Sequence, residues 1–186
     1  LEKGNKIDNN FGFALDIGTT QLTAYLMDLN TGQSLDYISE PNKQIKFGAD
    51  VISRLTYIMK GGKNLSNIHL TLISQINEIL KRLIKKRKIN PINIYEGVVV
   101  GNTVMMHTFH KSDPTPLSKY PYTPKIKKAV YKSSRFFNLK INRLSMIYTP
   151  PNIAGYMGSD IVSDIISSEI YKEEDNSILI DIGTNT

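Results

Sequence analysis

An apolar run that ends in Asp-Ile-Gly-Thr occurs twice in this chain, as Phe13-Ala14-Leu15-Asp16-Ile17-Gly18-Thr19 and as Ile178-Leu179-Ile180-Asp181-Ile182-Gly183-Thr184. A buried strand that enters such a turn presents one carboxylate to a cation, while the Gly-Thr turn offers backbone N–H groups and a hydroxyl group to phosphate. The alternative is a plain hairpin turn in which the Asp accepts hydrogen bonds from its own backbone. Two copies in one chain favour a phosphate group that is held from both sides.

Each residue type in the repeat has an expected chemical role. We expect Asp16 and Asp181 to hold Mg²⁺ through water, because Mg²⁺ keeps most of its water and takes few carboxylates together with phosphate oxygens. Gly18 and Gly183 let the backbone approach phosphate closely. The expected donors to phosphate oxygens are the hydroxyl, amide and backbone groups of Thr19, Thr20, Thr184 and Asn185.

Composition narrows the class of protein. The chain has 186 residues, a net charge of +6 and no cysteine, which excludes disulfides and Cys-ligated iron–sulfur clusters within it. No apolar run reaches the length of a membrane-spanning helix, and residues 1–10 lack the apolar stretch of a signal peptide, so a cytoplasmic protein without a membrane partner is predicted. One run of cations is interpreted as the end of a helix, with a nucleic-acid-binding module as the alternative. The run comprises Lys81, Arg82, Lys85, Lys86, Arg87 and Lys88.

Periodicity and turn signals predict an alternating α/β order. Three short strands at 11–18, 21–29 and 33–39 form an antiparallel meander. A region with four prolines, 111–143, is expected to be an irregular insertion. Strands that follow long helices add in parallel, which predicts a mixed sheet with helices on both faces. The remaining expected elements are helices at 49–60, 66–88, 103–110 and 158–171 and strands at 95–101, 144–148 and 177–182. The helices at 66–88 and 158–171 carry apolar stripes that are expected to face inward, and Val98 in the strand at 95–101 is expected to be buried.

This order, with Asp-x-Gly-Thr in the first hairpin, resembles the actin/sugar kinase/Hsp70 ATPase superfamily, whose members bind ATP between two ribonuclease-H-like domains. The resemblance narrows over several stretches that look like the ATP-binding region of reductive activators of corrinoid proteins. Members of that family are iron–sulfur ATPases that return cob(II)alamin to cob(I)alamin in methyltransferase systems. The stretches are GFALDIGTTQLTAYLMDLNTGQ, NKQIKFGADVISRL, VVVGNTVMMH, PNIAGYMGSD and LIDIGTN.

The resemblance implies a domain plan. Residues 1–10 would be a linker from an upstream region, residues 11–172 a first actin-like ATPase subdomain with 111–143 as its insertion, and residues 177–186 the first strand and phosphate turn of a second subdomain. The family's Cys-rich 2Fe–2S domain has no counterpart in a chain without cysteine, so a fragment is expected. ATP and Mg²⁺ are the implied cofactors, a corrinoid methyltransferase protein is the implied partner, and a homodimer is left open.

The resemblance and the predicted sheet point to further site residues. Asp160 would orient the attacking water of an ATPase; the alternative is a helix-start carboxylate that the helix dipole favours. Gly101 and Asn102 follow a buried strand whose carboxyl end would line the ligand crevice; capping of the next helix is the alternative for Asn102. The family-like stretch from Asn42 to Arg54 receives no functional role; within it, Asp50 is expected to start a helix and Arg54 to be a possible salt-bridge partner. A small-molecule kinase of the same superfamily is the alternative function.

Overall fold

The computed structural model describes residues 9–183, and its centre is a six-stranded sheet with the strand order β3-β2-β1-β4-β6-β5. The strands are β1 (Phe11–Ile17), β2 (Gln21–Asp28), β3 (Ser34–Pro41), β4 (Ile94–Gly101), β5 (Val130–Ser133) and β6 (Met146–Thr149). The α-helices are α1 (Val51–Met59), α2 (Asn64–Lys86), α3 (Thr103–Phe109) and α4 (Ser159–Ser168). Short 3₁₀ turns are η2 (Lys43–Phe47), η3 (Pro91–Asn93), η4 (Thr115–Ser118) and η5 (Ile170–Lys172).

The strand pairing follows the predicted α/β plan. The first three strands form an antiparallel meander in which β2 pairs with both β1 and β3. β4 adds in parallel to β1, and β6 adds in parallel to β4. Parallel strands end at the same edge of a sheet, so the residues that follow β1 and β4 lie next to each other. The mixed sheet with flanking helices is confirmed.

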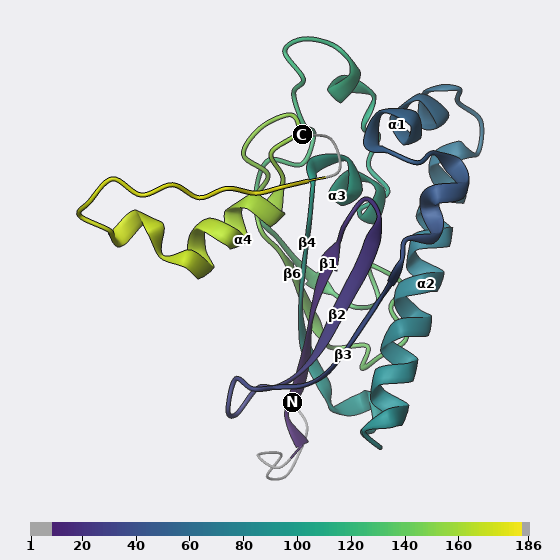
Figure 1. Cartoon of the computed structure of the whole chain (residues 1–186). Helices are drawn as coiled ribbons and strands as arrows, with labels where there is room; N and C mark the ends of the chain where they lie inside the picture. Colours follow the sequence, from purple (N-terminus) through teal and green to yellow (C-terminus); the bar gives the residue numbers. More distant parts are fainter. Residues whose placement is uncertain (1–8, 184–186) are drawn as a thin grey trace.

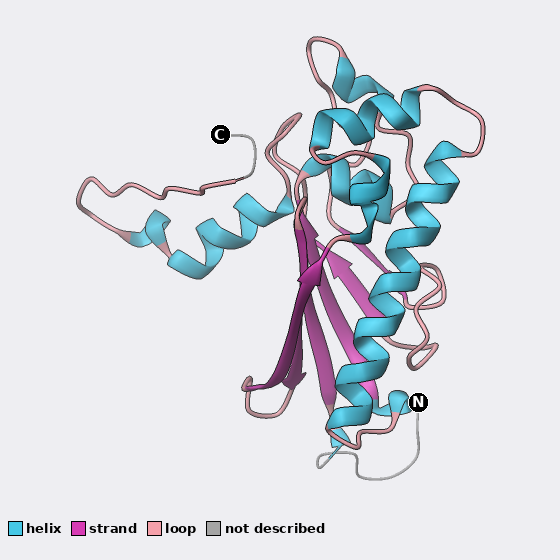
Figure 2. Cartoon of the chain, turned by 45° about the vertical axis from the view of Figure 1, so that its right-hand side comes forward, coloured by secondary structure: helices cyan, strands magenta, loops and turns pink. Residues whose placement is uncertain are grey.

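One face of the sheet forms the hydrophobic core with the long helix α2 (Figure 1, Figure 2). Alternate side chains of β1 point toward this helix, and Phe13, Leu15 and Ile17 are buried there. From α2, Ile76 and Ile79 are fully buried in the same cluster. Burial of each such side chain contributes roughly 1.5–3 kcal/mol, so the stripe predicted for residues 66–88 fixes α2 on the sheet.

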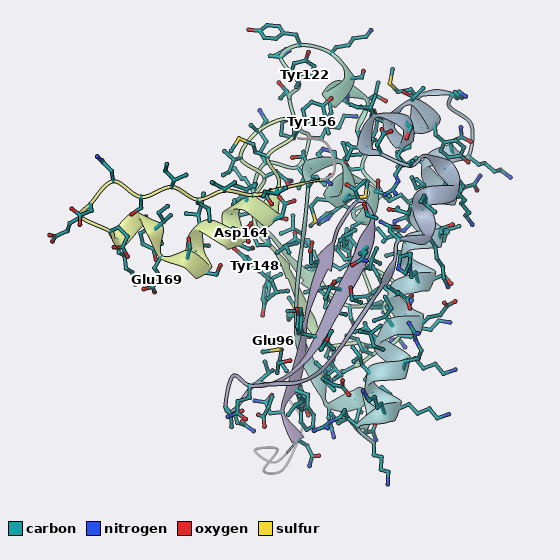
Figure 3. All side chains as sticks on the ribbon, in the orientation of Figure 1. Glu96, Tyr122, Tyr148, Tyr156, Asp164 and Glu169 are labelled. Carbon is teal, nitrogen blue, oxygen red and sulfur yellow. The ribbon has the colours of Figure 1, made fainter. Side chains whose placement is uncertain are left out.

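The opposite face of the sheet is largely open, contrary to the expected helices on both faces. In residues 9–183, α1 and α3 pack with α2, and α4 meets the sheet at the end of β4. Figure 3 shows the side chains, with Tyr148 and Glu96 labelled on the strands of this side. Val98, predicted to be buried, exposes 41% of its surface. The strand registers place one residue of each strand in a row across this face: Tyr37, Tyr25, Ala14, Val98, Tyr148 and Tyr131.

α4 projects from the body of the molecule, and the segment after it runs back toward the sheet (Figure 1). The helix is shorter than the predicted 158–171, because Glu169 has the left-handed φ of 52° that ends it before η5. Its apolar side chains were expected to face inward, yet Ser159 is the buried residue of this helix and Ile166 is exposed. This prediction is wrong because periodicity reports an apolar stripe and says nothing of a surface to cover it.

The strand predicted at Ser177–Ile182 does not form in the structure. A strand needs a neighbouring backbone for its N–H and C=O groups, and within residues 9–183 the six-stranded sheet leaves this segment out. Ile178, Ile180 and Ile182 are therefore exposed by 85%, 74% and 82%. The segment has strand-like sequence without a strand partner.

The region 111–143 is more ordered than the sequence indicates. It contains β5, which pairs antiparallel with β6. Only four residues long and half polar, β5 is too short to show an alternating pattern. Three side chains from the same region, Phe137, Leu139 and Ile141, are buried in the main core. The insertion is thus part of the domain.

Candidate functional site

The candidate site lies where β1, β4 and the start of α4 come together. Close approach of these three segments depends on glycine, since a Cβ atom would collide with neighbouring backbone. A Cβ at Gly101 would lie 2.8 Å from the Ile17 oxygen of β1, and one at Gly158 would lie 2.3 Å from the Gly101 oxygen of β4. These two glycines let the strand ends and α4 meet. Gly18 acts within the turn after β1, where a Cβ would lie 2.6 Å from the Gln21 oxygen.

Asn102 joins the turn after β1 to the turn after β4. Its amide nitrogen donates to the Thr19 hydroxyl at 3.0 Å, and its Oδ1 accepts from the Met105 N–H at 3.0 Å. The first contact places Asn102 beside the Asp16–Thr20 turn, and the second caps α3. The capping interpretation is thus confirmed, and the same side chain also reaches the candidate site.

Ser159 fixes the first turn of α4 against Gly101. The two residues exchange contacts of 3.2 Å, in which the Gly101 N–H donates to the Ser159 hydroxyl and this hydroxyl donates to the Gly101 carbonyl. Ser159 is fully buried. The next residue, Asp160, is held in the first turn of α4, with its carboxylate accepting from the Ile161 N–H at 2.8 Å. A carboxylate in this position is favoured by the helix dipole.

Four carboxylates interact across the site. Desolvation by surrounding atoms raises the pKa of Asp16 to about 6, and repulsion from Asp160, Asp164 and Asp181 adds to the rise. Desolvation is also the main cause of the raised pKa of Asp160 and of Asp164, and the Asp181 charge raises both. Mutual repulsion of this kind is relieved by a cation. The arrangement brings the carboxylates of the two Asp-Ile-Gly repeats into one electrostatic cluster.

The acid that sequence reasoning missed is Asp164. It lies one helical turn after Asp160, and Figure 3 shows it on α4, on the same side as Tyr148. The i,i+4 spacing of two Asp residues on a predicted helix was available as a signal, because such residues share a helix face.

The second repeat is described only in part. Asp181 and Gly183 are exposed, and a Cβ at Gly183 would have no heavy atom within 4 Å, so packing at this point does not demand glycine. Thr184 and Asn185, two predicted phosphate ligands, lie outside the described residues. Of the predicted site, the structure brings together Asp16, Gly18, Thr19, Thr20, Gly101, Asn102, Asp160 and Asp181.

The carboxylates fit a weakly held hydrated Mg²⁺ better than a closed metal site. In the part of the chain that the structure describes, no group of three or more His, Asp or Glu side chains has the arrangement of a metal site. Mg²⁺ bound with nucleotide takes only one or two carboxylates, with water and phosphate oxygens as its other ligands. Asp16 and Asp181 can supply these carboxylates at the repelling cluster.

The histidines are structural. His107 donates from Nδ1 to the Thr103 carbonyl at 2.7 Å, and its Nε2 accepts from the Lys125 N–H at 2.9 Å. This pattern requires a neutral ring, and burial lowers its pKa. The contact ties the insertion to α3.

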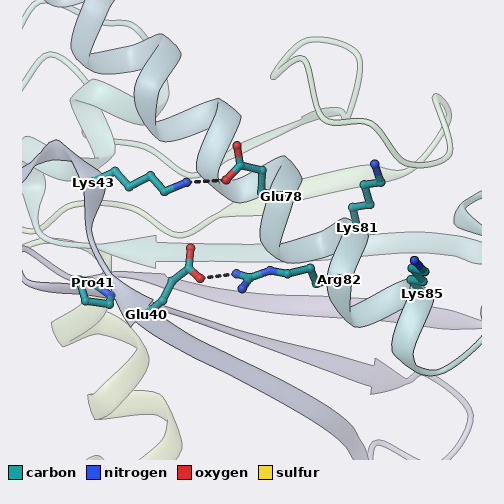
Figure 4. Close-up of a pocket in the computed structure, with 7 residues that line it drawn as sticks. All are labelled: Glu40, Pro41, Lys43, Glu78, Lys81, Arg82 and Lys85. Carbon is teal, nitrogen blue, oxygen red and sulfur yellow. Dashed lines mark hydrogen bonds and ion pairs between the residues drawn. The ribbon is translucent and has the colours of Figure 1, made fainter.

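The basic end of α2 forms a separate charged hollow, shown in Figure 4. Two ion pairs neutralise part of this hollow, because Arg82 binds Glu40 and Lys43 binds Glu78. Outside the hollow, Lys86 binds Asp36. Lys85 and Lys86 occupy the last turn of the helix, where cations complement the dipole. These pairs agree with the interpretation of the run as a charged helix end.

Comparison with models of protein families identifies the family of this chain. A model of the protein family described as the RACo middle region matches residues 11–173. The chain belongs to this family. The match spans all six strands and α4.

The individual relatives of this chain are described as activators or reductases of corrinoid proteins. A corrinoid activation enzyme, RamQ of Eubacterium limosum, is 33% identical over 175 residues, covering 94% of this chain and 29% of the relative. A Co(II) methylated amine-specific corrinoid protein reductase of Methanosarcina barkeri is 23% identical, covering 94% of this chain and 33% of the relative. A solved reductive activator for corrinoid, iron-sulfur protein superposes with a TM-score of 0.90 at 32% identity, over 94% of this chain and 28% of the other. The chain thus spans about a third of the length of these relatives or less.

Proposed function

We propose that this chain forms one wall of a Mg-ATP site in an ATP-dependent reductive activator of corrinoid proteins. One observation carries the proposal: the Asp16–Thr20 turn, the start of α4 and Asp181 meet in a single cluster of repelling carboxylates. A magnesium-bound phosphate supplies the cation that such a cluster lacks. Thr19 and Thr20 would donate to phosphate oxygens, and Asp160 would orient water at the terminal phosphate.

The chain would thus form only one side of the ATP site, here called a half-site. The wall described here offers carboxylates and a phosphate turn, while the segment 173–183 presents Asp181 from its exposed, strand-like stretch. By analogy with the corrinoid activators it resembles, the whole protein would couple ATP hydrolysis to electron transfer from an iron–sulfur domain to cob(II)alamin. Coupling requires that nucleotide favour one conformational state over another.

Titration calorimetry with Mg-ATP tests nucleotide binding. We expect weak binding by the chain, loss of that binding in Asp16→Asn, and unchanged binding in the control Asp175→Asn, whose exposed carboxylate lies outside the cluster. Tight binding by the chain alone would contradict the half-site, and a complete absence of heat and of Mg-ATP-dependent stabilisation would contradict nucleotide binding.

We also propose that the insertion contacts the corrinoid protein partner through its exposed cations. Lys125 is engaged with Asp113 at 2.7 Å, whereas Lys127 and Lys128 are further cations of the same stretch. Deletion of residues 111–143 would remove core side chains, so the suitable variant is Lys127→Glu with Lys128→Glu. A partner affinity that this double variant leaves unchanged would contradict the contact.

A further inference from the structure

We propose that Asn42 and Arg54 are positioning residues that hold the Asp16–Thr20 turn in its phosphate-binding form; this role rests on the proposed function above. Both side chains are fully buried, and both belong to the stretch from Asn42 to Arg54, for which no functional role is predicted from sequence. Both side chains bond to backbone carbonyl groups of the turn. Their action is therefore on its backbone.

Three successive carbonyl groups of the turn accept hydrogen bonds from Asn42 and Arg54. The Gly18 carbonyl accepts from the Asn42 amide nitrogen at 2.8 Å. The Thr19 carbonyl accepts from a terminal guanidinium nitrogen of Arg54 at 2.6 Å. The Thr20 carbonyl accepts from the Asn42 backbone N–H at 2.8 Å.

These contacts set the direction of the neighbouring N–H groups. In a planar trans peptide the C=O group and the following N–H group point in opposite directions. Because Asn42 and Arg54 pull the Gly18 and Thr19 carbonyls inward, the N–H groups of Thr19 and Thr20 are turned away from the interior. This is the orientation that an anion-binding turn needs.

Asn42 and Arg54, together called the clamp, are themselves held by further hydrogen bonds. Asn42 Oδ1 accepts from the Gln44 N–H at 2.9 Å, and the buried Gln44 side chain donates to the Ile68 carbonyl of α2 at 3.2 Å. Arg54 Nε donates to the Gly48 carbonyl at 2.9 Å. Asp50 and Ser53 form a capping box that starts α1, so Arg54 projects from a fixed first turn.

Gly48 allows the two parts of the clamp to meet. A Cβ there would lie 2.4 Å from the Ser53 hydroxyl and 2.7 Å from the Arg54 nitrogen. The φ of Gly48 is 159°, close to extended backbone, so the need for glycine comes from this contact.

Arg54 also carries a positive charge beside the turn, without a direct ion pair to any described residue. Within residues 9–183, none of the ion pairs includes Arg54. Burial lowers its pKa to about 10 and the Asp50 charge raises it, so the guanidinium stays charged at neutral pH. Each of its three nitrogens donates to one partner, namely the Gly48 carbonyl, Met105 Sδ at 3.3 Å and the Thr19 carbonyl. The positive charge adds to the attraction of the turn for an anion.

The test uses Arg54→Lys, which keeps the charge but loses the planar fork, and Asn42→Asp, which keeps the shape but loses the donor to Gly18. Arg82→Lys is the matched control, since Arg82 is an exposed helical arginine paired with Glu40. Amide exchange of residues 18–20 is measured without ligand. NMR titration with magnesium pyrophosphate, and separately with adenosine, then reports on phosphate binding.

We expect faster exchange of the turn amides and about tenfold weaker pyrophosphate binding in Arg54→Lys and in Asn42→Asp, with no change in Arg82→Lys. A thermal unfolding curve identifies variants that fold, and either clamp variant suffices for the test. If the NMR signals of the wild-type turn amides did not change with added pyrophosphate, the proposed phosphate role would be refuted. Wild-type amides that respond, together with folded clamp variants of unchanged exchange and affinity, would refute the positioning role alone.

Discussion

At the scale of single residues, Asp16 links the stability of the chain to its proposed ligand. Its folded-state pKa of about 6 lies above the ordinary value of 3.8. The folded chain therefore binds this proton more readily than the unfolded chain does. Ionisation of Asp16 then lowers the free energy of unfolding as pH rises from about 4 to 6. Asp16→Asn should raise the free energy of unfolding by about 1 kcal/mol at pH 7, a figure reduced for the exposure of the side chain. It should have little effect at pH 4.

Urea unfolding at the two pH values measures this difference, and Asp175→Asn serves as the control. The same reasoning predicts that Mg²⁺ affinity falls as pH drops through about 6, where Asp16 takes up its proton. An Asp16→Asn variant with equal effects at both pH values would show that the carboxyl group is not strained in the folded state.

Residues of the candidate site could be predicted from the sequence where their role depends on neighbours in the chain. Asp16 and Gly18 follow directly from the Asp-Ile-Gly-Thr repeat, and Asn102 from the end of a buried strand. Arg54 was not predictable, because its partner Thr19 lies 35 positions away and its helix supplies no hint of which carbonyl it reaches. Long-range hydrogen bonds to backbone leave no periodic pattern in a sequence.

At the scale of elements, β4 separates a covered face from an open one. Val99 is completely buried against the core, whereas its neighbour Val98 faces the open side. Val99→Ala should lower the free energy of unfolding by about 2 kcal/mol through lost burial and a residual cavity. Val98→Ala should change it by less than about 0.5 kcal/mol. Chemical denaturation of the two variants makes the comparison, and equal losses would mean that the second face is covered in solution.

α4 is expected to be the least protected helix of the fold. It has one buried residue, whereas α2 has ten, and local opening is easiest where few apolar contacts are lost. Amide hydrogen exchange should therefore be much faster in α4 than in the centre of α2. Protection of α4 equal to that of α2 would indicate that a second copy or another chain covers its apolar stripe.

The elements also show the limit of pattern reading. The stripe of α2 and the stripe of α4 look alike in sequence, and both predict a helix. Only α2 finds a surface, because the meander and β4 present Leu15, Ile17 and Val99 toward it. Periodicity establishes that an element is amphipathic, while its burial depends on what the rest of the chain places opposite.

At the scale of the whole molecule, two buried histidines, His69 and His107, and the half-buried His110 connect the parts of the fold. His69 of α2 contacts the Thr108 carbonyl of α3 at 2.9 Å, His107 holds the insertion, and His110 contacts the Thr149 hydroxyl of β6 at 3.1 Å. Burial lowers the pKa of all three, and that of His110 falls to about 4 with further repulsion from His107 and His69. The folded chain therefore depends on neutral imidazoles at several junctions.

Acid should consequently loosen the molecule as a whole, and His110 should account for much of the effect. Its pKa is lower in the folded than in the unfolded chain, so its contribution is complete above about pH 6.5 and is lost as pH falls toward 4. This loss amounts to at most about 3 kcal/mol. In His110→Gln the free energy of unfolding should fall less between pH 6.5 and pH 4 than in the wild type, as measured by urea denaturation. Both chains carry Asp16, so its opposite pH dependence cancels in the comparison. Equal losses in the two chains would show that the His110 ring reaches water before the fold opens.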